Sequence, residues 1–264
     1  MAPVRLFALV ALTGCSLAFP LRAADNDTPD SQLPDSPAAD GRSPDGPVDS
    51  PVDDRLLVHH EMESVPSSGV LEDSAGDHDA SCVGSECPTE IPAVVGNGLA
   101  FEGNDVLAVA SLATIELQNF TVAMWIRPTF DGFGCVLTRQ FSNQTANSFA
   151  LCVDAAGAAT ISILTNNLTR TTTAAAAISV GDGFVHLATT WDGTTLRLFI
   201  GGIETGVDTF SPALIDYDNH EVVIGADTDA GMRTSLYHGL MDDLRIYQAA
   251  LSQSEISELA TAPN

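Results

Sequence analysis

The sequence contains no lysine, and its ten basic residues, all arginine, face 35 acidic residues, which gives a formal net charge of −25. A chain this acidic repels the phosphate backbone of nucleic acids, so nucleic acid is not expected as a partner, whereas divalent cations are favoured. Aromatic residues are also scarce, at 6%. This scarcity weakens the case for a glycan site, because such sites need exposed aromatic surfaces with polar rims.

A membrane-spanning run is lacking at the N-terminus. The apolar segment 6–12 is too short to cross a bilayer, which takes about 20 helical residues. It follows a single positive charge, Arg5, and this order is typical of an export signal that is removed from the mature protein.

Residues 12–15, "LTGC", resemble the lipobox of a bacterial lipoprotein signal. The resemblance implies cleavage before Cys15 and a lipid on its sulfur. The alternative is ordinary cleavage near Ala23 or Ala24. In both cases residues 1–24 form a signal segment, and Cys15 does not belong to the folded domain.

Residues 25–54 are rich in Asp, Pro, Ser and Gly and contain no aromatic residue. Such a segment cannot bury enough apolar surface to offset the entropy lost on ordering, so we predict a disordered acidic linker. Like charges extend it and prolines stiffen it, which suits a spacer that holds a domain away from a membrane. The alternative is a disordered N-terminal region without a role.

From Arg55 onward the chain consists of short β-rich runs separated by Gly, Asp and Asn. The Asp-Gly pair at 192–193 is a strong turn signal between two alternating segments, which predicts a hairpin. Only the C-terminal end has a helical pattern, because Ser252 and Glu255 form a capping box. Many short strands with such turns predict an all-β fold, an antiparallel two-sheet jelly-roll sandwich with a short C-terminal helix, over residues 55–262.

Three blocks carry a likeness to a known family, and they are "GNGLAFEG", "FVHLATTWDGTTLRLFIGG" and "GLMDDLRIYQAALSQSEISEL". The upstream "VLEDSAGDHDASCVGS" is similar to the family's opening motif, with Asp77 and His78 in place of its usual Asn and Gly. The sequence thus resembles the LamG-like jelly-roll domains of the concanavalin A-like lectin/glucanase group, over about residues 55–260. The blocks are specific for the fold and weak for the function, because one fold hosts many activities.

Four cysteines remain once Cys15 is set aside. In the architecture that the resemblance implies, Cys82 and Cys87 bracket a tight turn, and Cys135 and Cys152 flank a hairpin that would place them opposite one another. An exported chain meets an oxidising compartment, so we predict the disulfides Cys82–Cys87 and Cys135–Cys152. For the second pair, the alternative is two buried free thiols.

The resemblance also implies one structural calcium ion. Strict alternation puts Asp242 on one face with Leu244 and Ile246, where an unpaired carboxylate would be costly. Family members often hold calcium near this Asp and near the loop of Asp73, so we expect Asp73, Asp77 and Asp242 as ligands, completed by backbone carbonyls. The alternatives for Asp242 are a salt bridge to an arginine and hydrogen bonds from loop amides.

A glycan site has to be sought among aromatic residues in loops. Trp125 and Trp191 lie in strand blocks and are predicted to be core residues. The aromatic residues that remain free to bind a ligand are Phe130, Phe133, Tyr217 and Tyr237.

No catalytic pattern is found in the sequence. Glucanases of this fold use a Glu-x-Asp-x-x-Glu strand, which is missing, and so is a Gly-x-Ser-x-Gly elbow. We expect a non-catalytic module of an exported bacterial protein, an outer-membrane or cell-surface lipoprotein or else a secreted or periplasmic protein, that binds a surface glycan or a protein partner in adhesion or matrix contact. The alternatives are a structural domain of the envelope without a soluble ligand and, less favoured, a glycoside hydrolase.

Overall fold

The structure is a computed structural model that describes residues 53–261, apart from residues 66 and 144. The predicted signal segment, with Cys15, and nearly all of the predicted linker 25–54 lie outside the described residues. Within the described part of the chain, no helix has the length and apolar character needed to cross a membrane.

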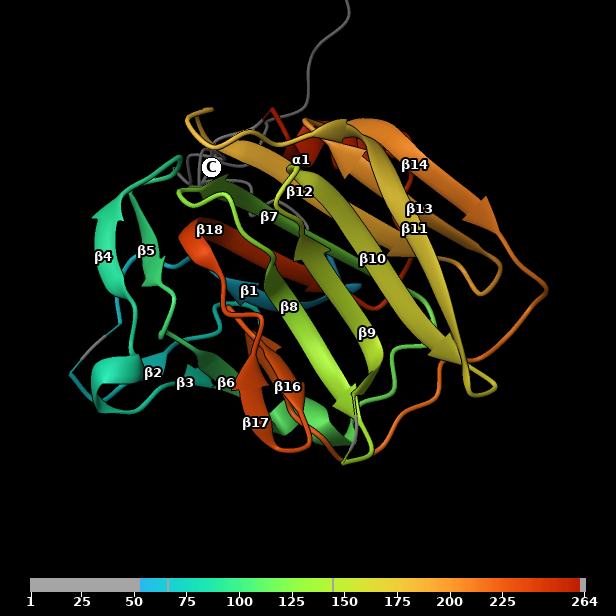
Figure 1. Cartoon of the computed structure of the whole chain (residues 1–264), viewed down its shortest axis with the longest axis horizontal. Helices are drawn as coiled ribbons and strands as arrows, with labels where there is room; N and C mark the ends of the chain where they lie inside the picture. Colours follow the sequence, from blue (N-terminus) through green and yellow to red (C-terminus); the bar gives the residue numbers. More distant parts are fainter. Residues whose placement is uncertain (1–52, 66, 144, 262–264) are drawn as a thin grey trace, which may run out of the picture. The chain divides into compact units, whose positions relative to one another are not determined.

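Two antiparallel sheets of eight strands each form the domain (Figure 1). The first sheet has the spatial order β14-β13-β12-β7-β18-β5-β4, with β1 paired to β18. Its strands are β1 (Leu56–His60), β4 (Thr89–Pro92), β5 (Asn97–Glu102), β7 (Phe120–Pro128), β12 (Val185–Trp191), β13 (Thr195–Ile200), β14 (Ile203–Thr209) and β18 (His238–Tyr247). The predicted all-β, two-sheet jelly-roll sandwich is therefore confirmed.

The second sheet has the order β11-β10-β9-β8-β15-β6-β3-β2, and a separate hairpin is made of β16 and β17. The strands are β2 (Val70–Leu71), β3 (Ala80–Ser81), β6 (Leu107–Val109), β8 (Gly134–Phe141), β9 (Ala146–Val153), β10 (Ala158–Thr165), β11 (Leu168–Ala177), β15 (Val222–Ile224), β16 (Asp227–Asp229) and β17 (Met232–Thr234). Two short 3-10 helices cover Gly84–Glu86 and Ala110–Thr114.

The predicted hairpin at residues 192–193 joins β12 and β13. Leu187 pairs with Ile200, and Trp191 pairs with Leu196. All four side chains belong to the hydrophobic core between the sheets or pack against it, and Trp191 is fully buried. The alternation that is visible in the sequence therefore places the core side of this hairpin correctly.

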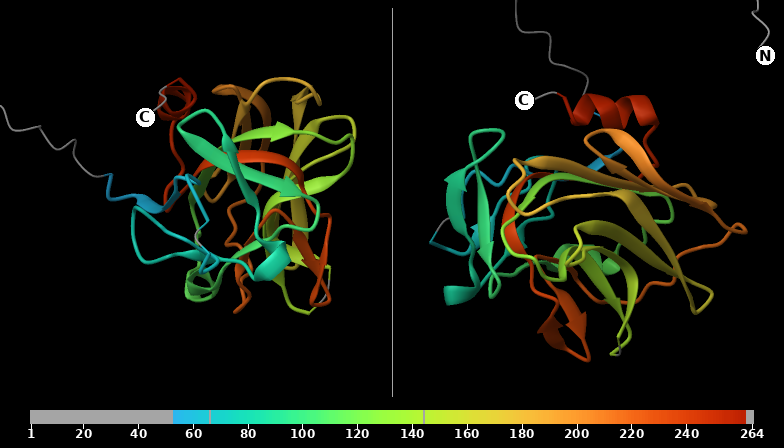
Figure 2. Two further views of the ribbon diagram at one scale, coloured as in Figure 1. Left: turned by 90° about the vertical axis from the view of Figure 1, so that its left-hand side faces the viewer. Right: turned by 45° about the horizontal axis from the view of Figure 1, so that its top comes forward.

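The C-terminal helix α1 (Gln253–Leu259) begins with the predicted capping box. The Ser252 side chain accepts a hydrogen bond from the Glu255 amide, and the Glu255 carboxylate accepts one from the Ser252 amide at 2.7 Å. Its buried residue Ile256 belongs to one hydrophobic cluster with Phe199 of β13. The helix lies over the first sheet (Figure 2). The local sequence thus sets where this helix begins, and one apolar side chain sets where it docks.

A β-bulge in β18 breaks the alternation on which the predicted orientation of Asp242 depends. Asp243 lies in the left-handed region with φ 52°, and the register against β7 shifts between Asp242 and Arg245. Met241 and Leu244 both face the core, so Asp242 lies on the opposite face. The prediction that Asp242 and Leu244 share a face is therefore wrong, because counting in twos assumes a regular strand, whereas a bulge inserts one residue.

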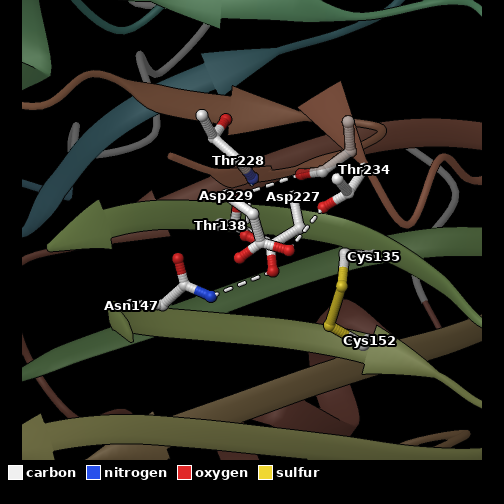
Figure 3. Close-up of a disulfide and its surroundings, with 9 residues drawn as sticks. Cys135, Thr138, Asn147, Cys152, Asp227, Thr228, Asp229 and Thr234 are labelled. Carbon is white, nitrogen blue, oxygen red and sulfur yellow. Dashed lines mark hydrogen bonds between the residues drawn. A yellow bond between two sulfur atoms is a disulfide. The ribbon is translucent and has the colours of Figure 1, made fainter. Parts of the chain in front are cut away.

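Both predicted disulfides are present, Cys82–Cys87 and Cys135–Cys152. Cys135 on β8 is directly opposite Cys152 on β9, with a Cα–Cα distance of 3.9 Å (Figure 3). A closed loop of this size stabilises the fold by about 3 kcal/mol in the chain-entropy account. The bond ties together two strands that run directly into the loops described next.

Candidate functional site

Four loops at one end of the sandwich line a small cavity. They are residues 128–134 between β7 and β8, 154–157 between β9 and β10, 178–180 after β11, and 236–238 at the start of β18. The cavity encloses about 190 Å³. Pockets that enclose a drug-sized ligand start at about 300 Å³. This cavity therefore suits one ring of a longer ligand rather than a whole oligosaccharide.

Two exposed phenylalanines flank the cavity. Phe130 is 59% exposed and Phe133 is 55% exposed. Large apolar side chains that stay in water contribute little hydrophobic free energy to folding. The ring of Phe130 lies 5.2 Å from the ring of His238, tilted by 45°. Gly132 allows this arrangement, since a Cβ at position 132 would lie 2.3 Å from Cε1 of Phe130. The result is a fixed apolar surface next to a polar hollow.

Backbone hydrogen bonds hold the four loops together. The Thr129 amide donates to the His238 carbonyl at 3.1 Å, and the Ile178 amide donates to the Gly157 carbonyl at 2.8 Å. At the base, the Cys135 amide donates to the Ser235 carbonyl at 2.8 Å. The disulfide fixes the two strands below, so the rim is built on rigid elements.

The structure brings three of the four predicted ligand residues to the cavity, but only two of them are accessible. Phe130, Phe133 and Tyr237 line it. The side chain of Tyr237 is 2% exposed and packs edge-on against Phe101, and burial raises the pKa of its hydroxyl. Tyr237 therefore forms the wall, and contact with a ligand falls to Phe130 and Phe133.

Tyr217, the fourth predicted ligand residue, is not brought to this cavity. Its hydroxyl donates to the Leu117 carbonyl at 2.8 Å, and its ring covers the guanidinium of Arg139 at 4.5 Å. Burial raises the pKa of the Tyr217 hydroxyl. The side chain has a structural role over a buried charge, and we leave it out of the proposed ligand set.

The two tryptophans differ in their positions. Trp191 is fully buried in the main core, as predicted. Trp125 faces away from that core, half-buried, with its ring edge-on to His186 at 5.2 Å. Burial lowers the pKa of His186 to about 4. The prediction that Trp125 is a core residue is therefore wrong for the main core. Its ring packs on the other face of β7, which is covered as well.

The three predicted calcium ligands are held by other partners or lie in solvent. Asp73 accepts hydrogen bonds from the amides of His59, Ala75 and His78 at 2.8–3.1 Å, and Asp77 is exposed. No set of three or more His, Cys, Asp or Glu side chains is grouped to hold a metal ion in the region that the structure covers. Backbone amides of its own loop and of β1 therefore satisfy the carboxylate of Asp73.

Asp242 also has backbone partners. Its Oδ2 accepts from the amides of Val94 and Val95, both at 2.9 Å, while Oδ1 is buried without a partner. Loop amides thus satisfy one carboxylate oxygen of Asp242, as in the alternative without calcium that the sequence left open. The unpartnered Oδ1 is the only feature here that suits a cation, so calcium at Asp242 stays a proposal.

Asp242 gives the first testable prediction. Burial raises the pKa of Asp242 from 3.8 to about 6, so the charged form is disfavoured in the folded state. The protonated side chain of Asp242 contributes to the stability of the fold below pH 4, and this contribution is lost as the pH rises through 6. Without metal, Asp242→Asn should therefore become more stable than the wild type as the pH rises from 4 to 7. The difference in the free energy of unfolding should reach about 3 kcal/mol, and it should appear as a higher melting temperature of the variant.

Calcium would change this result, because a bound cation stabilises the carboxylate. Millimolar calcium should raise the melting temperature of the wild type and leave that of Asp242→Asn unchanged. Chelator-treated wild-type protein serves as the reference. A wild-type melting curve that ignores calcium would reject the metal and leave the loop-amide account.

A chain of hydrogen bonds also links Ser74, His59 and Asp243 on another part of the surface. Ser74 Oγ lies 3.0 Å from His59 Nδ1, and His59 Nε2 lies 2.7 Å from Asp243 Oδ1. Asp243 is shared with Arg245, and Ser74 Oγ also lies 3.1 Å from the His59 carbonyl, which can take its proton. We interpret the chain as a tie between β1 and the bulge of β18 rather than as an activated nucleophile.

The comparison with known proteins assigns the fold to a family. The family model described as "Concanavalin A-like lectin/glucanases superfamily" matches residues 101–257. Domain 4 of AbnA, an extracellular arabinanase from Geobacillus stearothermophilus, has a TM-score of 0.57 at 18% identity and covers 78% of this chain and 98% of its own. The binding domain of Paraclostridial Mosquitocidal Protein 1 has a TM-score of 0.61 at 17% identity and covers 78% and 52%.

One curated relative is the Adhesion G-protein coupled receptor V1 of Danio rerio. It is 26% identical over 153 residues, which are 56% of this chain but 2% of the receptor. The chain thus spans a very small part of this relative, and the structural neighbours show the fold alone. The family model, however, matches more than half of the chain. This chain therefore belongs to the concanavalin A-like lectin/glucanase superfamily, as its sequence motifs indicate.

Proposed function

We propose that this domain is a non-catalytic, extracellular binding module that holds a glycan at the loop cavity. The observation on which this proposal depends is the pair Phe130 and Phe133, which stays exposed beside a polar hollow in a chain with few aromatic residues. A sugar ring can stack its C–H face on such a surface while its hydroxyls meet loop backbone groups.

The relatives support this function. The AbnA domain is described in complex with arabinotriose, and another neighbour, the binding domain of Botulinum Neurotoxin DC, in complex with SialylT. The curated relative is an adhesion receptor. The two disulfides suit an oxidising, extracellular setting. A lipid anchor at Cys15 stays a prediction from the sequence.

A glycan array tests the proposed function. The array should hold neutral arabino-, gluco-, manno- and galacto-oligosaccharides, amino-sugar oligomers, and uronate, sialylated and sulfated glycans. We expect at least one class to bind the disulfide-intact protein and to be released when its free oligosaccharide is added. A structural domain of the envelope would bind none of them, and this outcome would reject the proposed site. Shortening of any oligosaccharide during incubation would instead favour a glycoside hydrolase.

A further inference from the structure

Every arginine in the part of the chain that the structure describes contacts an aromatic ring, a backbone carbonyl or a carboxylate. Arg127 lies over the ring of Phe184 at 5.4 Å and Arg170 over that of Phe210 at 5.1 Å, and neither forms an ion pair among the described residues. Arg139 is buried and donates to three backbone carbonyls. The remaining four form ion pairs with carboxylates, and they are Arg55, Arg197, Arg233 and Arg245. The chain has no lysine that could take their place.

The loop cavity itself has acidic walls. The titratable side chains of its rim are those of Asp131, Asp154 and His238, and its lining includes neither arginine nor lysine. The carboxylate of Asp154 accepts hydrogen bonds from the amides of Ala156 and Ala158 at 2.8 and 2.9 Å, so its side chain is held in place. Asp131 is exposed and forms none of the ion pairs in the described residues. A sugar stacked on Phe130 and Phe133 would therefore have a carboxylate beside it.

This distribution of charge bears on the kind of sugar that the site accepts. Proteins hold carboxylate, sulfate and phosphate groups mainly through arginine, whose planar fork binds two oxygens at once, or through lysine. Neither side chain is among the residues that line the cavity. At physiological ionic strength charges act over about 8 Å, so Asp131 would repel an anionic ring that is bound in the cavity. An ammonium group at the same place would be attracted.

We propose that the loop cavity takes sugars that are uncharged or that carry a free ammonium group, and that it rejects sugars that carry carboxylate, sulfate or phosphate groups. This inference rests on the proposed glycan site, and it names the chemical class of its ligand. Asp131 is the residue that separates the amino sugars from the neutral ones.

The glycan array described above gives the first test, because its members can be sorted by charge. We expect all binding members to be neutral or amino sugars, with uronate, sialylated and sulfated members at least tenfold weaker at low salt. Binding of an anionic glycan as tightly as its neutral counterpart would overturn the charge rule and leave the glycan site standing. Binding of no member at all would remove both proposals together.

The second test changes one charge at the rim. Asp131→Asn keeps the shape of the side chain and should weaken binding of glucosamine oligomers by about two- to fivefold, as expected for one exposed ion pair, with binding of neutral oligomers unchanged. Asp208→Asn is the matched control, since it removes the same charge from an exposed position on β14. Equal losses for amino and neutral sugars in Asp131→Asn, or equal losses in both variants, would show that Asp131 does not select by charge.

Discussion

Replacing Phe130 and Phe133 together with alanine is expected to weaken glycan binding by about 100-fold. Each ring contributes apolar area and face-to-ring contact of about 1.5 kcal/mol, and both losses fall in the same bound complex. Both side chains are more than half exposed, so the melting temperature should change little. The measurement is a calorimetric titration with the tightest member of the array, alongside a thermal melt of the same samples.

Two further variants make this prediction sharper. Gly132→Ala keeps both rings, but its Cβ would lie 2.3 Å from Cε1 of Phe130, so the ring has to turn away and affinity should fall. Gly183→Ala is the control, because a Cβ there meets nothing within 4 Å. Ile203→Ala removes another exposed apolar side chain, on β14, and should not affect binding. Unchanged affinity in the Phe130/Phe133 double variant would place the glycan elsewhere.

Replacing Arg139 with methionine is expected to destabilise the fold by about 3–5 kcal/mol. Arg139 is 1% exposed, and its guanidinium donates to the carbonyls of Ala113, Ile115 and Asp218. Methionine fills much of the volume but leaves three partly buried carbonyls without these donors, and each loss costs free energy. The ring of Tyr217 loses its cation as well. Chemical denaturation measures the change.

The control for this prediction is Arg170→Met. Arg170 lies over Phe210 and donates to the hydroxyl of Thr165 at 3.3 Å, but it is only half-buried, so the loss should stay below about 1 kcal/mol. Equal stability of Arg139→Met and wild type would mean that apolar packing compensates for the lost donors, against our account. A larger loss of stability in Arg139→Met than in Arg170→Met would also support the structural role of Tyr217, because its ring covers Arg139.

Features that depend on near neighbours in the chain follow from the sequence. The turn at residues 192–193, the capping box of Ser252 and the disulfide Cys135–Cys152 are all set by short spacings, and the structure has each of them. The family motifs add the two-sheet arrangement, because three blocks in order identify one fold. The exposed pair Phe130 and Phe133 could be named because both lie in a loop, although the same criterion also named Tyr237, which is buried.

The cavity itself could not be predicted, because its parts lie far apart in the sequence. Nothing local shows that His238 meets Phe130 across 108 positions, or that residues 154–157 and 178–180 close the same rim. The proposed role of Asp131 also depends on its position at this cavity.

By itself the sequence determined the class of fold, the signals for local turns and the cysteine pairs, since these depend on alternation and on contacts between near neighbours. Only the tertiary structure decided the side on which Asp242 lies, the position of Tyr217 over Arg139 and the lack of an arginine in the lining of the loop cavity. A bulge adds one residue to a strand without a signal in the alternation of the sequence. The partners of a buried charge come from segments far apart in the chain, so neither the bulge nor these partners can be predicted from periodicity and composition.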